Sequence, residues 1–287
     1  MNPPFKTTFT WLQNLVSQRV VHTSPTRNLT ANQIFLEIIR SLSQVSEPTE
    51  IVYSSIGPDE GELICRSLDV HAGVERQGVR LNYNSYLGIL RVKIMPINLH
   101  DVHQRWINFS IMEWRCNGII NRAEAKLLWS GVGTTFTNFS GVYQGSIKQP
   151  DHFLRVDTSP DPRIVVESGW SESFPHLRSD KDLWLRGNVS VKLVILLKWS
   201  SLSNRRIKGT AEIWRRNTAG NLFSSTMPIF PAPRPLPPNE LIQFTKGELF
   251  GPALLLGQAA GTLFDLDIVQ LREFASEVIR TMGMQPA

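Results

Sequence analysis

The spacing of apolar residues changes along the chain between the period of an α-helix and that of a β-strand. After Thr30 the apolar residues recur at helical intervals and predict a helix that ends near residues 46–48. Residues 88–95, GILRVKIM, are strand-like and stop at a proline, and residues 191–199, VKLVILLKW, form a continuous apolar run typical of a strand buried on both faces. This succession predicts an α/β (α+β) fold, a mixed central β-sheet flanked by helices.

The same signals give the other expected elements. Further strands are expected over 51–55, 141–147, 151–156, 164–167, 206–214 and the start of 241–250. Further helices are expected over 99–116, 122–129, 173–186 and 266–280. Turn residues fill 57–61 and 157–162, DTSPDP, and predict breaks there.

Three segments follow from these elements. Residues 1–49 are expected to be an N-terminal extension with one docking helix, residues 50–264 the main domain, and residues 265–287 a C-terminal helix packed on that domain. Six prolines lie within 227–238, MPIFPAPRPLPP, and indicate a rigid surface connection. The alternative is a polyproline ligand for an SH3-like module.

Composition narrows the function classes. Hydrophobic residues make up 41% of the 287 residues, which is enough for a substantial core, and the net charge of +5 is compatible with a polyanionic partner. Two cysteines cannot form a four-cysteine zinc site or a disulfide framework. Neither a signal peptide nor an apolar stretch of roughly 18 residues is found, so we expect an intracellular protein, cytoplasmic or nuclear, without a membrane segment.

Two carboxylates are placed symmetrically about the DTSPDP turn. Asp151 lies eight residues before Ser159 and Glu167 eight residues after it. In an antiparallel hairpin centred there they face each other, with Cβ atoms roughly 4.5–5.5 Å apart. They would repel each other without a cation between them, and Mg²⁺ (or Mn²⁺) prefers oxygen ligands. The alternative is that both acids are merely exposed at a sheet edge.

The helix expected over 173–186 adds a cation. One of its faces is shared by Phe174, Leu177, Lys181 and Trp184. The other three are apolar and should face the sheet, so we expect Lys181 to extend its stem over apolar surface toward Glu167. An amine there could stabilise charge on a phosphate or orient an attacking water. The alternative is that Lys181 reaches solvent or pairs with Asp180 or Glu172.

These residues carry a family resemblance. The sequence Pro150–Asp151, followed by Val165–Val166–Glu167, a helix and a buried strand, resembles the PD-(D/E)xK restriction-endonuclease-like superfamily. It is most similar to the Uma-type restriction endonuclease family, in a fungal branch that reads ESGWSES…LRSDKDLWL…VKLVILLKW, here residues 167–199. The match covers roughly residues 87–264 and implies a restriction-endonuclease-like core.

The resemblance implies a metal-dependent phosphodiesterase in which Asp151 and Glu167 bind Mg²⁺ or Mn²⁺. The superfamily's usual lysine would stand at position 169, where this chain has Gly169. The Uma-type family also lacks that lysine and takes it from the next helix, about fourteen residues after the glutamate. That spacing falls on Lys181, the residue that the helical face indicates independently.

Other candidates have weaker support, and each has a structural alternative in packing, capping or solvation. The accessory candidates are Glu62, His103, Glu172 and Asp180. The candidates for contacts with nucleic acid, through phosphates or stacked bases, are Lys148, Trp170, Arg205, Arg206 and Lys208.

The sequence therefore predicts a magnesium-dependent endonuclease that acts on nucleic acid, most directly DNA. Many such nucleases act as dimers, so a homodimer is a further expectation. The alternative is a catalytically degenerate nuclease-fold protein that binds nucleic acid or a protein partner. A third hypothesis is an interaction module that uses the proline segment.

Overall fold

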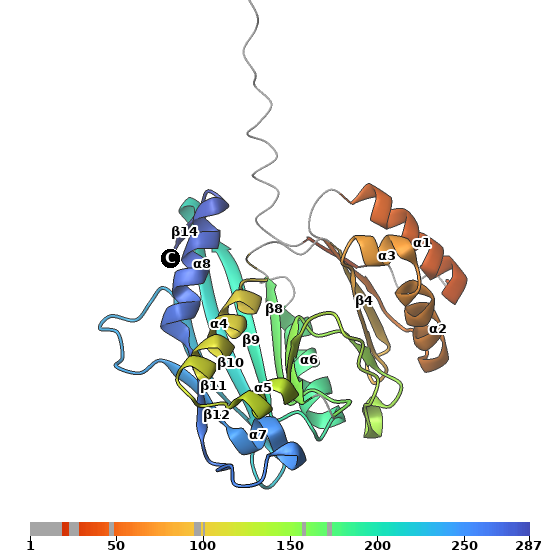
Figure 1. Ribbon diagram of the computed structural model, residues 1–287. Coiled ribbons are helices and arrows are strands. Elements are labelled where there is room, and N and C mark those ends of the chain that lie inside the picture. The colour runs from red at the N-terminus through yellow and green to blue at the C-terminus, as the bar shows by residue number, and fades with distance from the viewer. Residues whose placement is uncertain are drawn as a thin grey trace, which may run out of the picture.

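The computed structural model describes residues 19–22, 29–45, 49–94, 99, 101–156, 159–170 and 174–287. Its main features are a five-stranded and a seven-stranded sheet, each with helices packed against it (Figure 1). Strands pair in both parallel and antiparallel directions, so the predicted mixed α/β class is confirmed. No described helix is both long enough and apolar enough to cross a lipid bilayer.

The smaller sheet and three helices form a unit with a core of its own, called here the N-terminal unit. Its strands lie in the order β1-β2-β4-β3-β6. Its elements are β1 (Arg19–His22), α1 (Ala31–Gln44), β2 (Thr49–Tyr53), α2 (Pro58–Asp69), α3 (Ala72–Arg76), β3 (Arg80–Asn84), β4 (Ile89–Ile94) and β6 (Ile147–Lys148). The core consists of residues from α1 and α2, such as Ile38 and Ile64, and of alternate strand residues such as Val92.

The remaining elements form the α/β unit, whose large sheet has the order β11-β10-β9-β8-β7-β5 with β14 beside β10. The strands are β5 (Leu128–Gly131), β7 (His152–Val156), β8 (Ile164–Trp170), β9 (Leu193–Leu202), β10 (Arg206–Arg216), β11 (Leu222–Phe230) and β14 (Gln285–Pro286). The helices are α4 (Val102–Cys116), α5 (Arg122–Leu127), α6 (Phe174–Gly187), α7 (Lys246–Phe250) and α8 (Ile268–Thr281). A two-stranded sheet joins β12 (Leu241–Thr245) to β13 (Leu263–Asp267).

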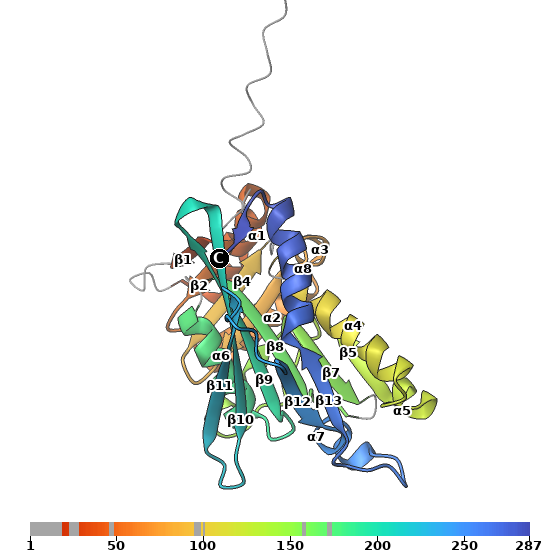
Figure 2. The same cartoon turned by 90° about the vertical axis from the view of Figure 1, so that its left-hand side faces the viewer.

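Helices cover both faces of the large sheet. Figure 2 shows α6 on one side of it and α4 with α8 on the other. Odd-numbered Phe153 and Val165 pack with α6, whereas even-numbered Leu154 and Val166 belong to the larger core on the side of α4 and α8. β9 is buried on both faces along its first five residues, as its apolar run predicts. The parallel pair β8–β9 is joined through α6, which packs on β8, the strand that carries Glu167 at its centre.

Some predicted boundaries are wrong. The division at residue 49/50 separates α1 from β2, yet both contribute to one core, so α1 is part of the N-terminal unit and not of an extension. The break predicted over 57–61 is the start of α2, which Gly57 and Pro58 begin. The strand predicted over 141–147 is a short 3-10 turn at Gly141–Tyr143 followed by β6.

The C-terminal helix lies on the α/β unit, and the proline segment runs from β11 to β12. α8 packs against α4 and β11. The prolines begin within β11 and continue through a surface connection to β12. Arg272 of α8 fixes both ends of that connection, because its guanidinium donates to the Ile229 and Pro228 carbonyls and pairs with buried Glu240.

Candidate active site

The β7–β8 ladder sets the positions of the two predicted carboxylates. His152 pairs with Val166 and Phe153 with Val165, so the next position in this register places Asp151 opposite Glu167. The predicted hairpin register is therefore confirmed. Because side chains alternate across a strand, Asp151 and Glu167 share the face of Phe153 and Val165, which is the face that α6 covers.

Lys93 and a backbone amide both hold the Asp151 carboxylate. Its Oδ2 accepts a hydrogen bond from the backbone N–H of Ser168 at 2.8 Å and from Lys93 Nζ at 3.3 Å. Lys93 comes from β4 of the N-terminal unit. The carboxylate is thus fixed between the strand that carries Glu167 and a cation from the other unit.

Glu167 is fully buried, and among the described residues only one of its two carboxylate oxygens has a hydrogen-bond partner. Its Oε1 accepts from Trp184 Nε1 at 2.8 Å and pairs with Lys148 Nζ at 3.1 Å. Its Oε2 is buried, and none of the residues that the structure describes donates a hydrogen bond to it. Burial raises the pKa of Glu167 to about 7, with further increases from the Asp151 and Asp180 charges that Lys148 only partly offsets.

Lys148 connects this pair to a wider set of buried charges. Its amine also donates to Asp180 Oδ2 at 2.8 Å. Asp180, on α6, pairs in addition with Arg91 of β4, and Arg91 lies 3.3 Å from Glu50 Oε1. The buried ionic members are named here the charge layer: Glu50, Arg91, Lys93, Lys148, Asp151, Glu167 and Asp180.

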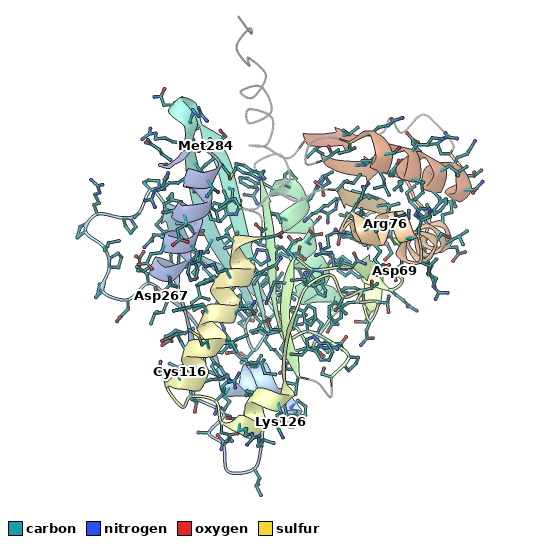
Figure 3. All side chains as sticks on the ribbon, turned by 45° about the horizontal axis from the view of Figure 1, so that its top comes forward. Asp69, Arg76, Cys116, Lys126, Asp267 and Met284 are labelled. Atoms are coloured by element: carbon teal, nitrogen blue, oxygen red, sulfur yellow. The ribbon has the colours of Figure 1, made fainter. Side chains whose placement is uncertain are left out.

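The charge layer lies where the two units meet. The side chains drawn in Figure 3 fill the space between the N-terminal unit, marked by Asp69 and Arg76, and the α/β unit, marked by Cys116 and Lys126. Glu50, Arg91, Lys93 and Lys148 come from the small sheet, and Asp151, Glu167 and Asp180 from the α/β unit. Four carboxylates thus meet three permanent cations.

The cations keep Glu50 and Asp180 ionised. Burial opposes the charge of Glu50, but the His176 hydrogen bond and the charges of Arg91 and Lys93 lower its pKa to about 2. Burial also opposes the charge of Asp180, and Arg91 and Lys148 nevertheless lower the pKa of that carboxyl. Glu167 differs from these two, since its pKa is raised.

Lys181 does not reach Glu167, so that prediction is wrong. Its amine pairs with Asp182 Oδ1 at 2.8 Å and lies 4.2 Å from the centre of the Trp214 ring. The residue of α6 that enters the charge layer is its neighbour Asp180. The apolar members of the predicted stripe, Phe174, Leu177 and Trp184, do pack in the core under α6. Only the lysine was misplaced, because positions three and four after Leu177 lie on adjacent sides of the same face.

The other predicted residues are scattered. His103 lies near the site, with Nε2 3.2 Å from the main-chain oxygen of Asp151. Trp170 is wholly buried in the core, so it has no face open to a base. Glu62 lies on α2, pairs with Arg66 and lines a separate cavity of about 390 Å³. Glu172 is outside the described residues.

The predicted basic hairpin is separate from the carboxylates. Arg205, Arg206 and Lys208 are exposed around the β9–β10 turn. β9 continues six residues beyond Leu196, the partner of Glu167, before that turn, which is roughly 20 Å at the rise of a strand. Lys148, predicted to contact nucleic acid, is instead fully buried against Glu167.

Arg91, Lys93 and Glu50 were missed by the sequence interpretation. A signal for the first two exists, because β4 alternates apolar Leu90, Val92 and Ile94 with these two cations. Such alternation indicates a strand with one polar face. It does not indicate that the polar face is buried against carboxylates of a distant segment.

The donor set suits a hard divalent cation with few protein ligands. Within the described part of the chain, no three histidine, cysteine or acidic side chains are grouped as a metal site. Mg²⁺ needs only one or two carboxylates when water and substrate phosphates complete its shell. The buried Oε2 of Glu167, opposite Asp151 in the ladder and in a layer with one surplus negative charge, is consistent with that chemistry.

Comparisons with known proteins add no relative. No family model matches the chain, and no curated protein or solved structure matches it either.

Proposed function

We propose that this chain is a metal-dependent nuclease whose centre is Asp151 and Glu167. The observation that carries the proposal is the placement of two buried carboxylates opposite each other on one sheet face, with the Lys148 amine 3.1 Å from Glu167. The order Asp151, strand β8 with Glu167, helix α6 and buried strand β9 is also the order that the restriction-endonuclease-like resemblance implies.

Asp151 and Glu167 would hold Mg²⁺ or Mn²⁺. When bound, such an ion lowers the pKa of a coordinated water and neutralises a phosphate. Trp184 and Ser168 keep the two carboxylates in place by donating hydrogen bonds to Glu167 and Asp151. The low-dielectric surroundings strengthen any charge interaction at this place.

Lys148, and not Lys181, is the cation we assign to this centre. Lys148 comes from β6, three residues before Asp151. The centre therefore has a lysine although position 169, where the superfamily's lysine is usual, is Gly169. Lys148 holds Glu167 and Asp180 together, which makes it a positioning residue for Glu167. We propose DNA as the substrate, since a metal–carboxylate centre and a positive net charge both suit a phosphodiester polyanion.

Plasmid cleavage tests the proposal. Wild-type protein with Mg²⁺ or Mn²⁺ should cut supercoiled DNA, and chelation of the metal should stop the cutting. Asp151→Asn, Glu167→Gln and Lys148→Met should each reduce the initial rate by about 100-fold or more. Lys181→Met is the matched control and should keep wild-type activity, because its amine pairs with Asp182.

A second function is favoured by one specific observation, the complete burial and near neutralisation of the carboxylates. A degenerate nuclease-fold protein that only binds nucleic acid or a protein partner would have that property. DNA binding by wild type without cutting under either metal would select this alternative.

A further inference from the structure

The face of the small sheet that covers the carboxylates is polar although it is buried. On β4, Leu90, Val92 and Ile94 point into the core of the N-terminal unit, whereas Arg91 and Lys93 point away from it. On β3, Leu81 and Tyr83 contribute to that core, and Asn82 and Asn84 alternate with them. An antiparallel sheet with this pattern usually has one face in the core and one face in water.

Ion pairs join this face to the α/β unit, beside the Phe136–Lys148 backbone bridge and the Tyr86–Tyr143 ring contact that also link the two units. Lys93 pairs with Asp151, Arg91 with Asp180, and Glu50 with His176 of α6. The apolar cores of the two units are separate clusters. Units that meet through polar contacts move relative to one another unless a large hydrophobic interface holds them.

The cover and a metal ion compete at Asp151. Lys93 Nζ occupies Asp151 Oδ2, whereas Lys148 Nζ positions Glu167 through Oε1 and leaves Oε2 facing the pair. A divalent cation placed at this pair would face the Lys93 ammonium across a short distance in a poorly screened interior. Metal and Lys93 therefore exclude each other, and no phosphodiester can reach carboxylates that are 2% and 0% exposed.

We propose that the N-terminal unit is a cover that closes the Asp151–Glu167 pair and opens when Lys93 and Arg91 release Asp151 and Asp180. In the opened state the polar face of β4 lies against solvent, and these two cations are the groups that substrate phosphates meet. The phosphate contact rests on the proposed nuclease function, whereas the opening does not.

Hydrogen–deuterium exchange of the full chain, with MnCl₂ as the added ligand, tests the cover. Lys93→Met removes the cation that contacts buried Asp151 in the closed state, so this variant should exchange faster in β4 and β8 without metal. Wild-type molecules that are closed cannot bind Mn²⁺, which weakens the apparent affinity of the wild type. The Kd of Lys93→Met for Mn²⁺ should therefore be lower than that of the wild type by at least about tenfold. Mn²⁺ should also accelerate exchange in β4 of the wild type.

Two controls define what a cation at this place does. Lys93→Arg keeps the charge and should stay closed, with exchange and Kd near wild type. Lys208→Met removes a lysine that is exposed near the β9–β10 turn and should change neither the exchange nor the Kd.

Glu50→Gln provides a second test variant outside the carboxylate pair. Faster β4 exchange is expected in it because the substitution weakens the contacts with His176 and Arg91. Glu50→Gln decides the proposal if circular dichroism shows Lys93→Met to be unfolded.

The cover and the nuclease can fail separately. Unchanged β4 and β8 exchange in folded Lys93→Met overturns the cover, and metal-dependent plasmid cutting under the same conditions leaves the nuclease standing. Faster exchange in Lys93→Met with neither Mn²⁺ binding nor cutting supports the cover and overturns the nuclease.

Discussion

Lys148 belongs to β6 and Lys181 to α6, and only one of them touches a carboxylate of the predicted pair. Lys148 is fully buried, with its amine 3.1 Å from Glu167, while Lys181 pairs with Asp182 beside the Trp214 ring. A buried amine without a carboxylate partner would be costly, so Lys148 depends on Glu167 and Asp180 as much as they depend on it.

Glu50 gives a prediction about pH. Its pKa in the fold is about 2, against an ordinary value of 4.5, so its contribution to the free energy of unfolding is present above pH 4.5 and is lost as pH falls toward 2. A shift of this size corresponds to about 3 kcal/mol. Urea unfolding of wild type and Glu50→Gln should therefore show a stability difference that shrinks by about that amount between pH 5 and pH 2. A difference that stays constant over that range would contradict the assigned pKa.

For single residues, the sequence predicted which carboxylates face each other but not which cations contact them. Asp151 and Glu167 could be paired by counting from Ser159, since a hairpin register depends on local spacing. Lys93 lies 58 residues before Asp151 along the chain. Its pairing depends on how two sheets pack, and no local pattern contains that information.

Elements with strong periodicity were predicted well, and elements with mixed signals were not. The apolar run of β9 and the repeat of α1 gave their type and approximate bounds. α2 was missed because glycine and proline at its start indicate a turn as readily as a helix. Its proline at the first position with Asp59 and Glu60 in the first turn is a helix-start pattern that would have found it.

β4 has one face in an apolar core and one face against carboxylates. The free energy of unfolding measures how deeply the core face is buried. Leu90 is completely buried in the core of the N-terminal unit, so Leu90→Ala should lower the free energy of unfolding by about 2–5 kcal/mol. Leu63, on the exposed side of α2, is the matched control, and Leu63→Ala should change it by less than about 0.5 kcal/mol. Equal effects in denaturant titrations would show that this face of β4 is not a core face.

The whole molecule differs most from the sequence interpretation in its division into units. The resemblance places its expected core roughly over residues 87–264, and in the structure the α/β unit begins at α4 and continues past β13 to β14. The N-terminal unit was not anticipated, because α2, α3 and β3 lie in a stretch without clear periodicity. It supplies every permanent cation of the charge layer, so the candidate site is a product of both units.

The proposed nuclease requires a metal centre at Asp151 and Glu167, and calorimetric titration with MnCl₂ measures metal binding there. We predict that the wild type binds Mn²⁺, that Asp151→Asn and Glu167→Gln lose this binding, and that Lys181→Met retains it. Mn²⁺ binding that is undiminished in folded Asp151→Asn, or absent from both wild type and Lys93→Met, would contradict the claim.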